Sequence, residues 1–131
     1  MKVRRQYLRN LIQEVQDENV LAAGDCYEAA GKYMMDNCMF GGCDLVLVHG
    51  EVMGQGRLEG MTYGHAWILN GNTVIDKSNG GNLHLPRQVY YSIGQIDNIG
   101  NTHTYTWEEA RRKIMDSGHW GPWDLKTKSG L

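Results

Sequence analysis

The dipeptide Asn70-Gly71 constrains the fold of this chain more than any other local feature. It lies between two short segments, residues 65–69 and 73–76, that are rich in apolar side chains. An Asn-Gly pair flanked in this way is the strongest short-range signal of a β-hairpin, because both central residues of a type I′ turn need positive φ angles. We therefore predict two antiparallel strands that are joined at this point.

The predicted hairpin places His65 and Asp76 on one face. If Asn70-Gly71 forms the two-residue turn, His65 lies directly opposite Asp76, with Cβ atoms ~4.5–5.5 Å apart. If the turn is Gly71-Asn72 instead, Asp76 faces Trp67 and lies one diagonal step from His65. In either register the Asp76 carboxylate can accept a hydrogen bond from the His65 ring.

Helical patterns flank this hairpin and predict an α+β domain, with helices packed on a small, mainly antiparallel sheet. Apolar residues recur at helical spacing over residues 3–18, and a second helix is expected over residues 25–37 with Asp25 as its N-cap. Residues 107–117 are expected to form a further helix, because Thr106 and Glu109 match a capping box.

The remaining segments give weaker signals. Residues 44–52 have the apolar character of a central strand, and residues 54–64 have the glycine content of a loop, which could form a mobile lid. Residues 83–96 are compatible with either strand or helix, residues 97–101 with a turn, and residues 126–131 with a frayed tail.

Length and charge limit the classes of protein to which the chain can belong. Its 131 residues fit a single domain spanning 1–131, and the net charge of −2 argues against a nucleic-acid or anionic-membrane partner. No segment approaches the ~20 apolar residues of a membrane span, and the N-terminus does not resemble a signal peptide. We therefore expect a cytoplasmic protein of unknown oligomeric state.

The three cysteines do not form a recognisable metal or disulfide framework. Cys38 and Cys43 lie close together with glycines between them, but His49 does not complete the four ligands that a structural zinc site needs. The odd cysteine number leaves at least one thiol unpaired, and we interpret Cys38 and Cys43 as two ordinary thiols. The sequence implies no metal and no cofactor.

Cys26 is the candidate nucleophile, because it falls in the first turn of the helix expected at residues 25–37. A helix N-terminus and a neighbouring histidine both favour the thiolate form of a cysteine. In this interpretation His65 takes the thiol proton, and Asp76 fixes the imidazole tautomer and stabilises the imidazolium. The alternative is that the three residues have structural roles only: Cys26 as a buried thiol, His65 as a hydrogen-bonded histidine and Asp76 as a turn residue.

Three segments together resemble the papain-like cysteine peptidase superfamily, and within it the transglutaminase-like core. They are residues 24–30 (GDCYEAA), 63–69 (YGHAWIL) and 74–78 (VIDKS). In that core a His-Ala-Trp strand is followed by a strand that ends in Asp, often within Asp-Pro-Thr/Ser; here Lys77 replaces the proline. The resemblance covers about residues 19–80. NlpC-type peptidases are the near neighbour, although their third site residue is often histidine.

The resemblance implies a cysteine peptidase or amidase that acts on a protein or peptide, with Cys26, His65 and Asp76 as its triad. The Cys26 backbone N–H can donate to an oxyanion, and Asn19 is the nearest amide side chain for a second donor. Tyr63, Gly64 and Trp67 are candidates for the walls of a substrate groove. A transamidase, an NlpC-type peptidoglycan hydrolase and a non-catalytic protein-binding module remain alternatives.

Overall fold

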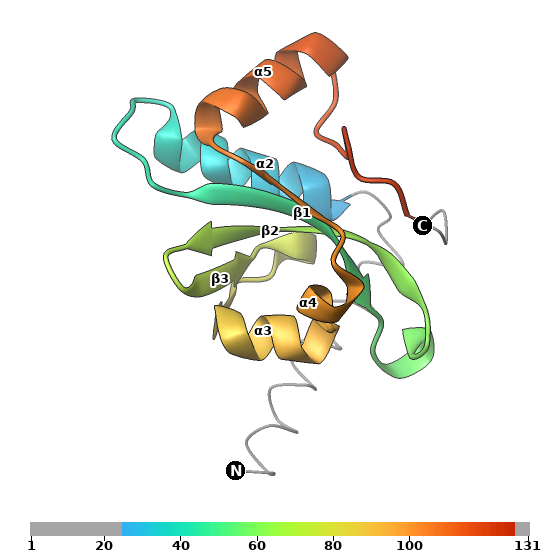
Figure 1. The fold of residues 1–131 in the computed structure, drawn as a ribbon. Helices are drawn as coiled ribbons and strands as arrows, with labels where there is room; N and C mark the ends of the chain where they lie inside the picture. Colours follow the sequence, from blue (N-terminus) through green and yellow to red (C-terminus); the bar gives the residue numbers. More distant parts are fainter. Residues whose placement is uncertain (1–24, 128–131) are drawn as a thin grey trace.

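An antiparallel β-sheet forms the centre of the molecule (Figure 1). The structure is a computed structural model that describes residues 25–127. The five strands of this part follow the spatial order β4-β3-β2-β1-β5. Their bounds are β1 Val46–Met53, β2 Thr62–Asn70, β3 Thr73–Asp76, β4 Leu83–Pro86 and β5 Thr102–Tyr105.

Helices cover both faces of the sheet. Helices α2 (Asp25–Cys38) and α5 (Trp107–Ser117) lie on one face, and α3 (Arg87–Gly94) and α4 (Ile96–Ile99) lie on the other (Figure 1). Two single-turn 3₁₀ helices, η1 (Gly56–Leu58) and η2 (Ser78–Gly80), follow β1 and β3. The α+β class with a small antiparallel sheet is therefore confirmed.

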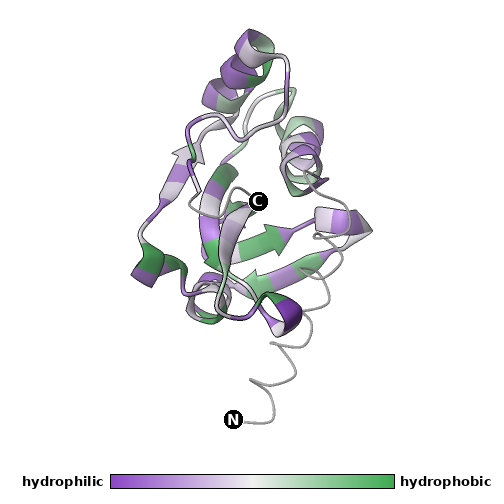
Figure 2. Ribbon diagram, turned by 90° about the vertical axis from the view of Figure 1, so that its right-hand side faces the viewer, coloured by the Kyte–Doolittle hydropathy of each residue, from purple (hydrophilic) through white to green (hydrophobic). Residues whose placement is uncertain are grey.

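Alternating side chains of the strands supply two hydrophobic cores, one on each face. Val48, Trp67 and Val74 pack with α3 and α4, whereas Leu47 and Ile68 pack with α2 and α5. This is the period-2 pattern of strands that are buried on both sides. Hydrophobic colouring accordingly concentrates on the central strands, and hydrophilic colouring is prominent on α5 (Figure 2).

The hairpin forms, but in the second of the two predicted registers. Asn70 pairs with Thr73 at the end of β2, so Gly71 and Asn72 form the turn and the Asn70-Gly71 turn is wrong. Gly71 has a φ of 61°, while Asn72 is not among the residues with positive φ. A glycine at the first central position is the pattern of a type II′ turn, which suits the twist of a hairpin as well as type I′ does.

The predicted helices within the described residues are confirmed to within a residue. Helix α5 begins after Thr106, whose side chain accepts a hydrogen bond from the Glu109 N–H while the Glu109 carboxylate accepts from the Thr106 N–H. It ends at Ser117, and the C-cap residue Gly118 has a φ of 76°. Residues 83–96, which were compatible with strand or helix, contain both: strand β4 and then helix α3. Residues 97–101 were predicted as a turn, but they include most of the short helix α4.

The cysteines pair differently from the prediction, and some predicted features lie outside the described residues. Cys38 and Cys43 form a disulfide with Cα atoms 5.0 Å apart, so the interpretation as two separate thiols is wrong, and Cys26 is the free cysteine. The helix expected over residues 3–18, Asn19 and most of the tail 126–131 lie outside the described residues. In the part of the chain that is described, no helix has the length and apolar character needed to cross a membrane.

Candidate active site

The structure brings Cys26, His65 and Asp76 together. His65 Nε2 lies 2.9 Å from Asp76 Oδ2, and the Cys26 side chain hydrogen-bonds to the His65 ring. Because Nε2 faces the carboxylate, Nδ1 is the ring nitrogen that remains for the thiol. All three residues are buried, with exposed fractions of 5% for Cys26, 0% for His65 and 1% for Asp76.

Cys26 contacts His65 near the end of strand β3, where α2 approaches the sheet. The side chains of His65 and Asp76 lie on the α3 face, where His65 stacks near Trp67, whereas α2 packs on the opposite face. Strand β3 ends at Asp76, and the chain turns away into η2 instead of continuing beside His65. Helix α2 contacts η2, and Asp25 at the start of α2 accepts from Asn79 of η2, so the first turn of the helix lies at this end of the sheet.

A long-range hydrogen bond ties the start of α2 to this turn. Asp25 Oδ2 accepts from the backbone N–H of Asn79 at 2.5 Å, across 54 residues of sequence. Asp25 was expected to cap its own helix, but it is the first residue of α2 and its carboxylate joins the helix to η2. The residue before the thiol and the segment after Asp76 are thereby held together.

Gly64 allows α2 to approach β2 next to His65. A Cβ atom at this position would collide with the Tyr27 hydroxyl and crowd Thr127 and Leu125. Glycine is therefore needed here for close packing and not for a special backbone angle. Gly64 is buried beneath these side chains, so it does not form the open groove wall that the sequence suggested.

Four hydrogen bonds from described residues hold the Asp76 carboxylate. Its Oδ1 accepts from the Ser78 N–H at 3.0 Å and from the Ser78 hydroxyl at 2.6 Å, and its Oδ2 accepts from the Tyr90 hydroxyl at 2.7 Å in addition to His65. Sequence reasoning did not assign either partner a role. The spacing Asp76-Lys77-Ser78 was a usable signal for Ser78, whereas Tyr90 reaches the site only through the packing of α3.

The surroundings favour the charged forms of both His65 and Asp76. Burial by itself lowers the pKa of His65, but the Asp76 and Cys26 side chains outweigh burial and raise it to about 10. Burial by itself raises the pKa of Asp76, but His65, Ser78 and Tyr90 outweigh it and lower the pKa to about 2. At neutral pH the site therefore contains an imidazolium beside a carboxylate.

The other two predicted groove residues belong to the core. Trp67 is completely buried, and its Nε1–H donates to the Tyr91 hydroxyl at 3.3 Å. Tyr63 is 5% exposed and packs in the same cluster. Their assignment to a groove is wrong, because β2 is a central strand with helices over both of its faces.

His49, which the sequence analysis considered only as a zinc ligand and rejected, is a buried histidine. Its ring lies among the rings of Tyr27, Tyr105 and Trp123, and neither ring nitrogen has a hydrogen-bond partner among the described residues. Burial, assisted by His103, lowers its pKa to about 3, although Asp124 opposes the shift. His49 is therefore neutral in the folded protein at physiological pH.

Replacing His49 by leucine is expected to remove a loss of stability in acid. The unfolded chain binds a proton at His49 below pH 6.5, whereas the folded chain does so only near pH 3. Wild-type stability therefore falls as pH drops through this window, by about 1.4 kcal/mol per pH unit for one proton. Urea denaturation of both proteins from pH 8 to pH 4 measures the difference, and parallel pH profiles would contradict a neutral buried His49.

Comparison with known proteins assigns this chain to no family. No protein-family model matches it, and neither the search of curated proteins nor the search of solved structures finds a match. The candidate site therefore rests on its own residues and geometry.

Proposed function

We propose that the chain is a cysteine-dependent acyl-transfer enzyme, most simply a peptidase or amidase of papain-like type. The observation that carries the proposal is the continuous hydrogen-bonded series from the Cys26 thiol through the His65 ring to the Asp76 carboxylate. A nucleophile, a base and a group that orients the base are the parts that covalent acyl transfer needs. The transglutaminase-like pattern of residues 24–30, 63–69 and 74–78 supports the same assignment.

In the proposed first step the Cys26 thiolate attacks the carbonyl carbon of an amide, and a C–S bond forms. The Cys26 backbone N–H belongs to the first turn of α2, whose N–H groups have no acceptor within the helix, so it can donate to the oxyanion. His65 then gives its proton to the departing amine nitrogen as the C–N bond breaks, and a thioester on Cys26 remains.

In the second step water attacks the thioester carbonyl. His65 accepts a proton from this water, the C–S bond breaks, and the Cys26 thiolate leaves beside the reformed imidazolium. Asp76 keeps its negative charge throughout and holds the ring with Nδ1 toward the thiol. Ser78 and Tyr90 position Asp76 and do not touch the reacting atoms.

The proposal predicts that p-nitrophenyl acetate acylates Cys26 alone. The unreduced protein should release a burst of about one nitrophenolate per chain, because the Cys38–Cys43 disulfide leaves one free thiol. Mass spectrometry should place the acetyl group on the peptide that contains Cys26. Cys26→Ala should give no burst with unchanged circular dichroism, and a burst of equal size in that variant would end the proposal.

The low exposure of Cys26 favours a second candidate, a binding module that retains the scaffold without turnover. This candidate would be supported if the protein shows no burst and if wild type and Cys26→Ala co-purify equally well with a partner. An added amine that traps the acyl group in preference to water would identify a transamidase. Loss of turbidity from purified cell walls would identify an NlpC-type hydrolase.

A further inference from the structure

Strand β5 has an outer edge that no other described strand pairs with. It is the last strand in the order β4-β3-β2-β1-β5, and its segment Thr102–Tyr105 contains neither a proline nor a Lys, Arg, Asp or Glu side chain. Proteins commonly protect such edges with charges, prolines or bulges. The opposite edge strand, β4, ends in Pro86.

The pairing with β1 shows which backbone groups of β5 point outward. The Glu51 N–H donates to the Asn101 carbonyl at 3.0 Å, and the same register sets His49 opposite His103. Hydrogen-bonded pairs of an antiparallel ladder recur at every second residue. Residues 101, 103 and 105 therefore direct their N–H and C=O groups toward β1, and Thr102 and Thr104 direct theirs away from it.

Among the described residues, nothing pairs with these outward groups. Thr102 and Thr104 are both exposed, and neither residue makes a hydrogen bond to a described residue beyond the ladder. Two N–H donors and two C=O acceptors alternate along this edge, which is the pattern that a further antiparallel strand satisfies.

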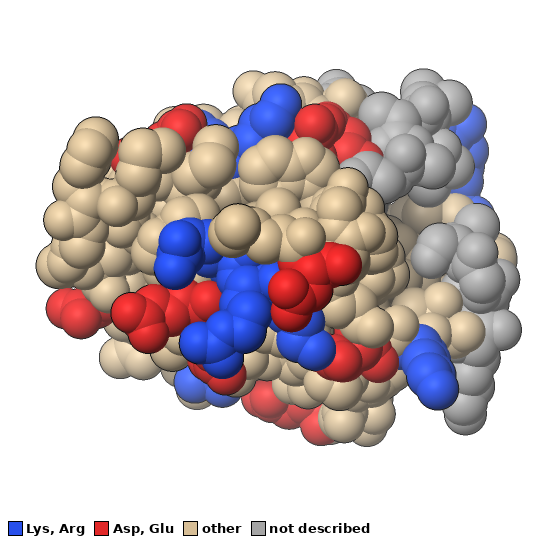
Figure 3. Space-filling view, turned by 90° about the horizontal axis from the view of Figure 1, so that it is seen from above, with Lys and Arg blue, Asp and Glu red and all other residues tan. Residues whose placement is uncertain are grey.

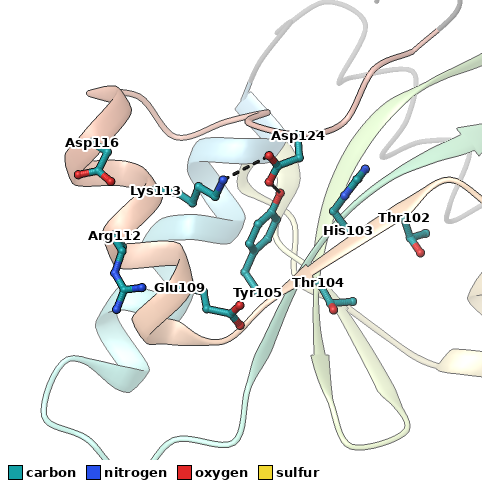
Figure 4. Close-up of a pocket in the computed structure, with 9 residues that line it drawn as sticks. All are labelled: Thr102, His103, Thr104, Tyr105, Glu109, Arg112, Lys113, Asp116 and Asp124. Carbon is teal, nitrogen blue, oxygen red and sulfur yellow. Dashed lines mark hydrogen bonds and ion pairs between the residues drawn. The ribbon is translucent and has the colours of Figure 1, made fainter.

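A groove runs beside this edge, between β5 and α5. Its volume is about 570 Å³, and Figure 4 shows the α5 side chains on one side with Thr102, His103 and Thr104 on the other. Four α5 residues line it at helical spacings of three and four, so they form one helical face. They are Glu109, Arg112, Lys113 and Asp116.

Charged side chains line the groove, and only some of them form ion pairs with one another. Lys113 is paired with Asp124 at 3.2 Å, and Asp124 also accepts from the Tyr105 hydroxyl at 2.6 Å. Glu109, Asp116 and Asp124 outnumber Arg112 and Lys113 among the lining residues. Figure 3, which views the molecule from the α5 side, shows acidic and basic side chains interleaved there.

We propose that the β5–α5 groove binds an extended, basic peptide segment of a partner protein as a sixth strand of the sheet. Backbone pairing with Thr102 and Thr104 supplies the hydrogen bonds, and Lys or Arg side chains at alternate positions face the acidic residues of α5. The groove lies two strands from β2, which carries His65, so it is separate from the candidate triad. The inference does not rest on the proposed enzymatic activity.

The probe is a seven-residue capped peptide of alternating threonine and lysine, added to the full chain labelled with ¹⁵N. Saturable binding should shift the amide signals of Thr102 and Thr104 and slow their hydrogen exchange. Two matched peptides are the controls: one with glutamate in place of lysine, and one N-methylated at alternate residues so that it cannot donate to the edge. Each should bind at least about tenfold more weakly.

Thr104→Pro tests the same contact from the protein side. Its N–H points away from β1, so proline should leave the existing ladder intact and still weaken peptide binding at least about tenfold. Thr104→Val keeps the N–H and should bind the peptide as wild type does. Equal binding of the N-methylated peptide, or shifts confined to residues outside β5 and α5, would overturn the proposal. So would a β5-mediated dimer, detected by sedimentation and abolished by Thr104→Pro.

Discussion

Replacing Asp76 by alanine is expected to lower the free energy of unfolding by about 3–5 kcal/mol at pH 6, the usual cost of removing one partner of a buried ion pair. The loss has two sources. His65, which is completely buried, would keep its charge without a counter-ion or give up its proton. The hydroxyl groups of Ser78 and Tyr90 would also lose their acceptor inside the protein.

The pH of this measurement follows from the two pKa shifts. Asp76 has a lowered pKa, so its stabilisation is present above the unfolded value of 3.8 and is lost as pH falls toward about 2. His65 has a raised pKa, so its stabilisation is present below the unfolded value of 6.5 and is lost as pH rises toward about 10. Between these limits, near pH 6, the pair contributes in full.

Urea denaturation of wild type and Asp76→Ala at pH 6 gives the difference directly. Asp44→Ala is the matched control, because Asp44 is exposed and should change stability by no more than about 0.5 kcal/mol. If Asp76→Ala does not fold, Asp76→Asn replaces it in the comparison. This variant keeps the side-chain volume and removes the charge, and its free energy of unfolding should still be lower than that of wild type. Wild-type stability in both Asp76 variants would contradict a buried ion pair at this site.

Replacing Trp67 by alanine is expected to cost about 3–5 kcal/mol, the range for truncating a fully buried aromatic side chain. Its ring packs against Tyr90 and Tyr91, with centroid distances of 5.6 and 5.7 Å, and the Tyr91 hydroxyl would lose a donor. Because Trp67 also stacks near His65, the cavity would remove support from that ring. The main effect of Trp67→Ala should therefore be a lower free energy of unfolding.

Trp67→Phe separates packing from hydrogen bonding. It keeps an aromatic ring in the core but has no N–H for Tyr91, so its loss of stability should be clearly smaller than that of Trp67→Ala. Denaturant midpoints of the three proteins at pH 7 provide the comparison. Wild-type stability in Trp67→Ala, together with altered reactivity of Cys26, would instead place Trp67 in a substrate groove.

Local signals predicted most of the elements that position the site. The Asn-Gly segment predicted the hairpin, and the capping box formed by Thr106 and Glu109 predicted α5, because both depend on residues close in sequence. His65 and Asp76 lie close together even though the turn was predicted one residue too early. In the observed register Asp76 faces Trp67 instead of His65, and residues two apart on a strand point to the same face.

Contacts between distant segments could not be predicted in this way. The Tyr90 hydroxyl reaches Asp76 only because α3 packs on one face of the sheet, and Asp25 binds Asn79 across 54 residues of sequence. Trp67 was misplaced for the same reason: a His-Ala-Trp strand does not reveal that helices cover both of its faces. The pairing of Cys38 with Cys43 likewise depends on how the segment after α2 turns back.

The pH dependence of iodoacetamide labelling at Cys26 tests the central claim most directly. The protein is kept unreduced so that Cys26 is the free thiol, and mass spectrometry reads the rate in wild type, His65→Ala and Asp76→Ala. We expect labelling that persists below pH 7 in wild type and falls at least about tenfold at pH 6 in His65→Ala. A rate that rises only near ~8.5, as for an ordinary thiol, and that ignores His65 would contradict an activated nucleophile.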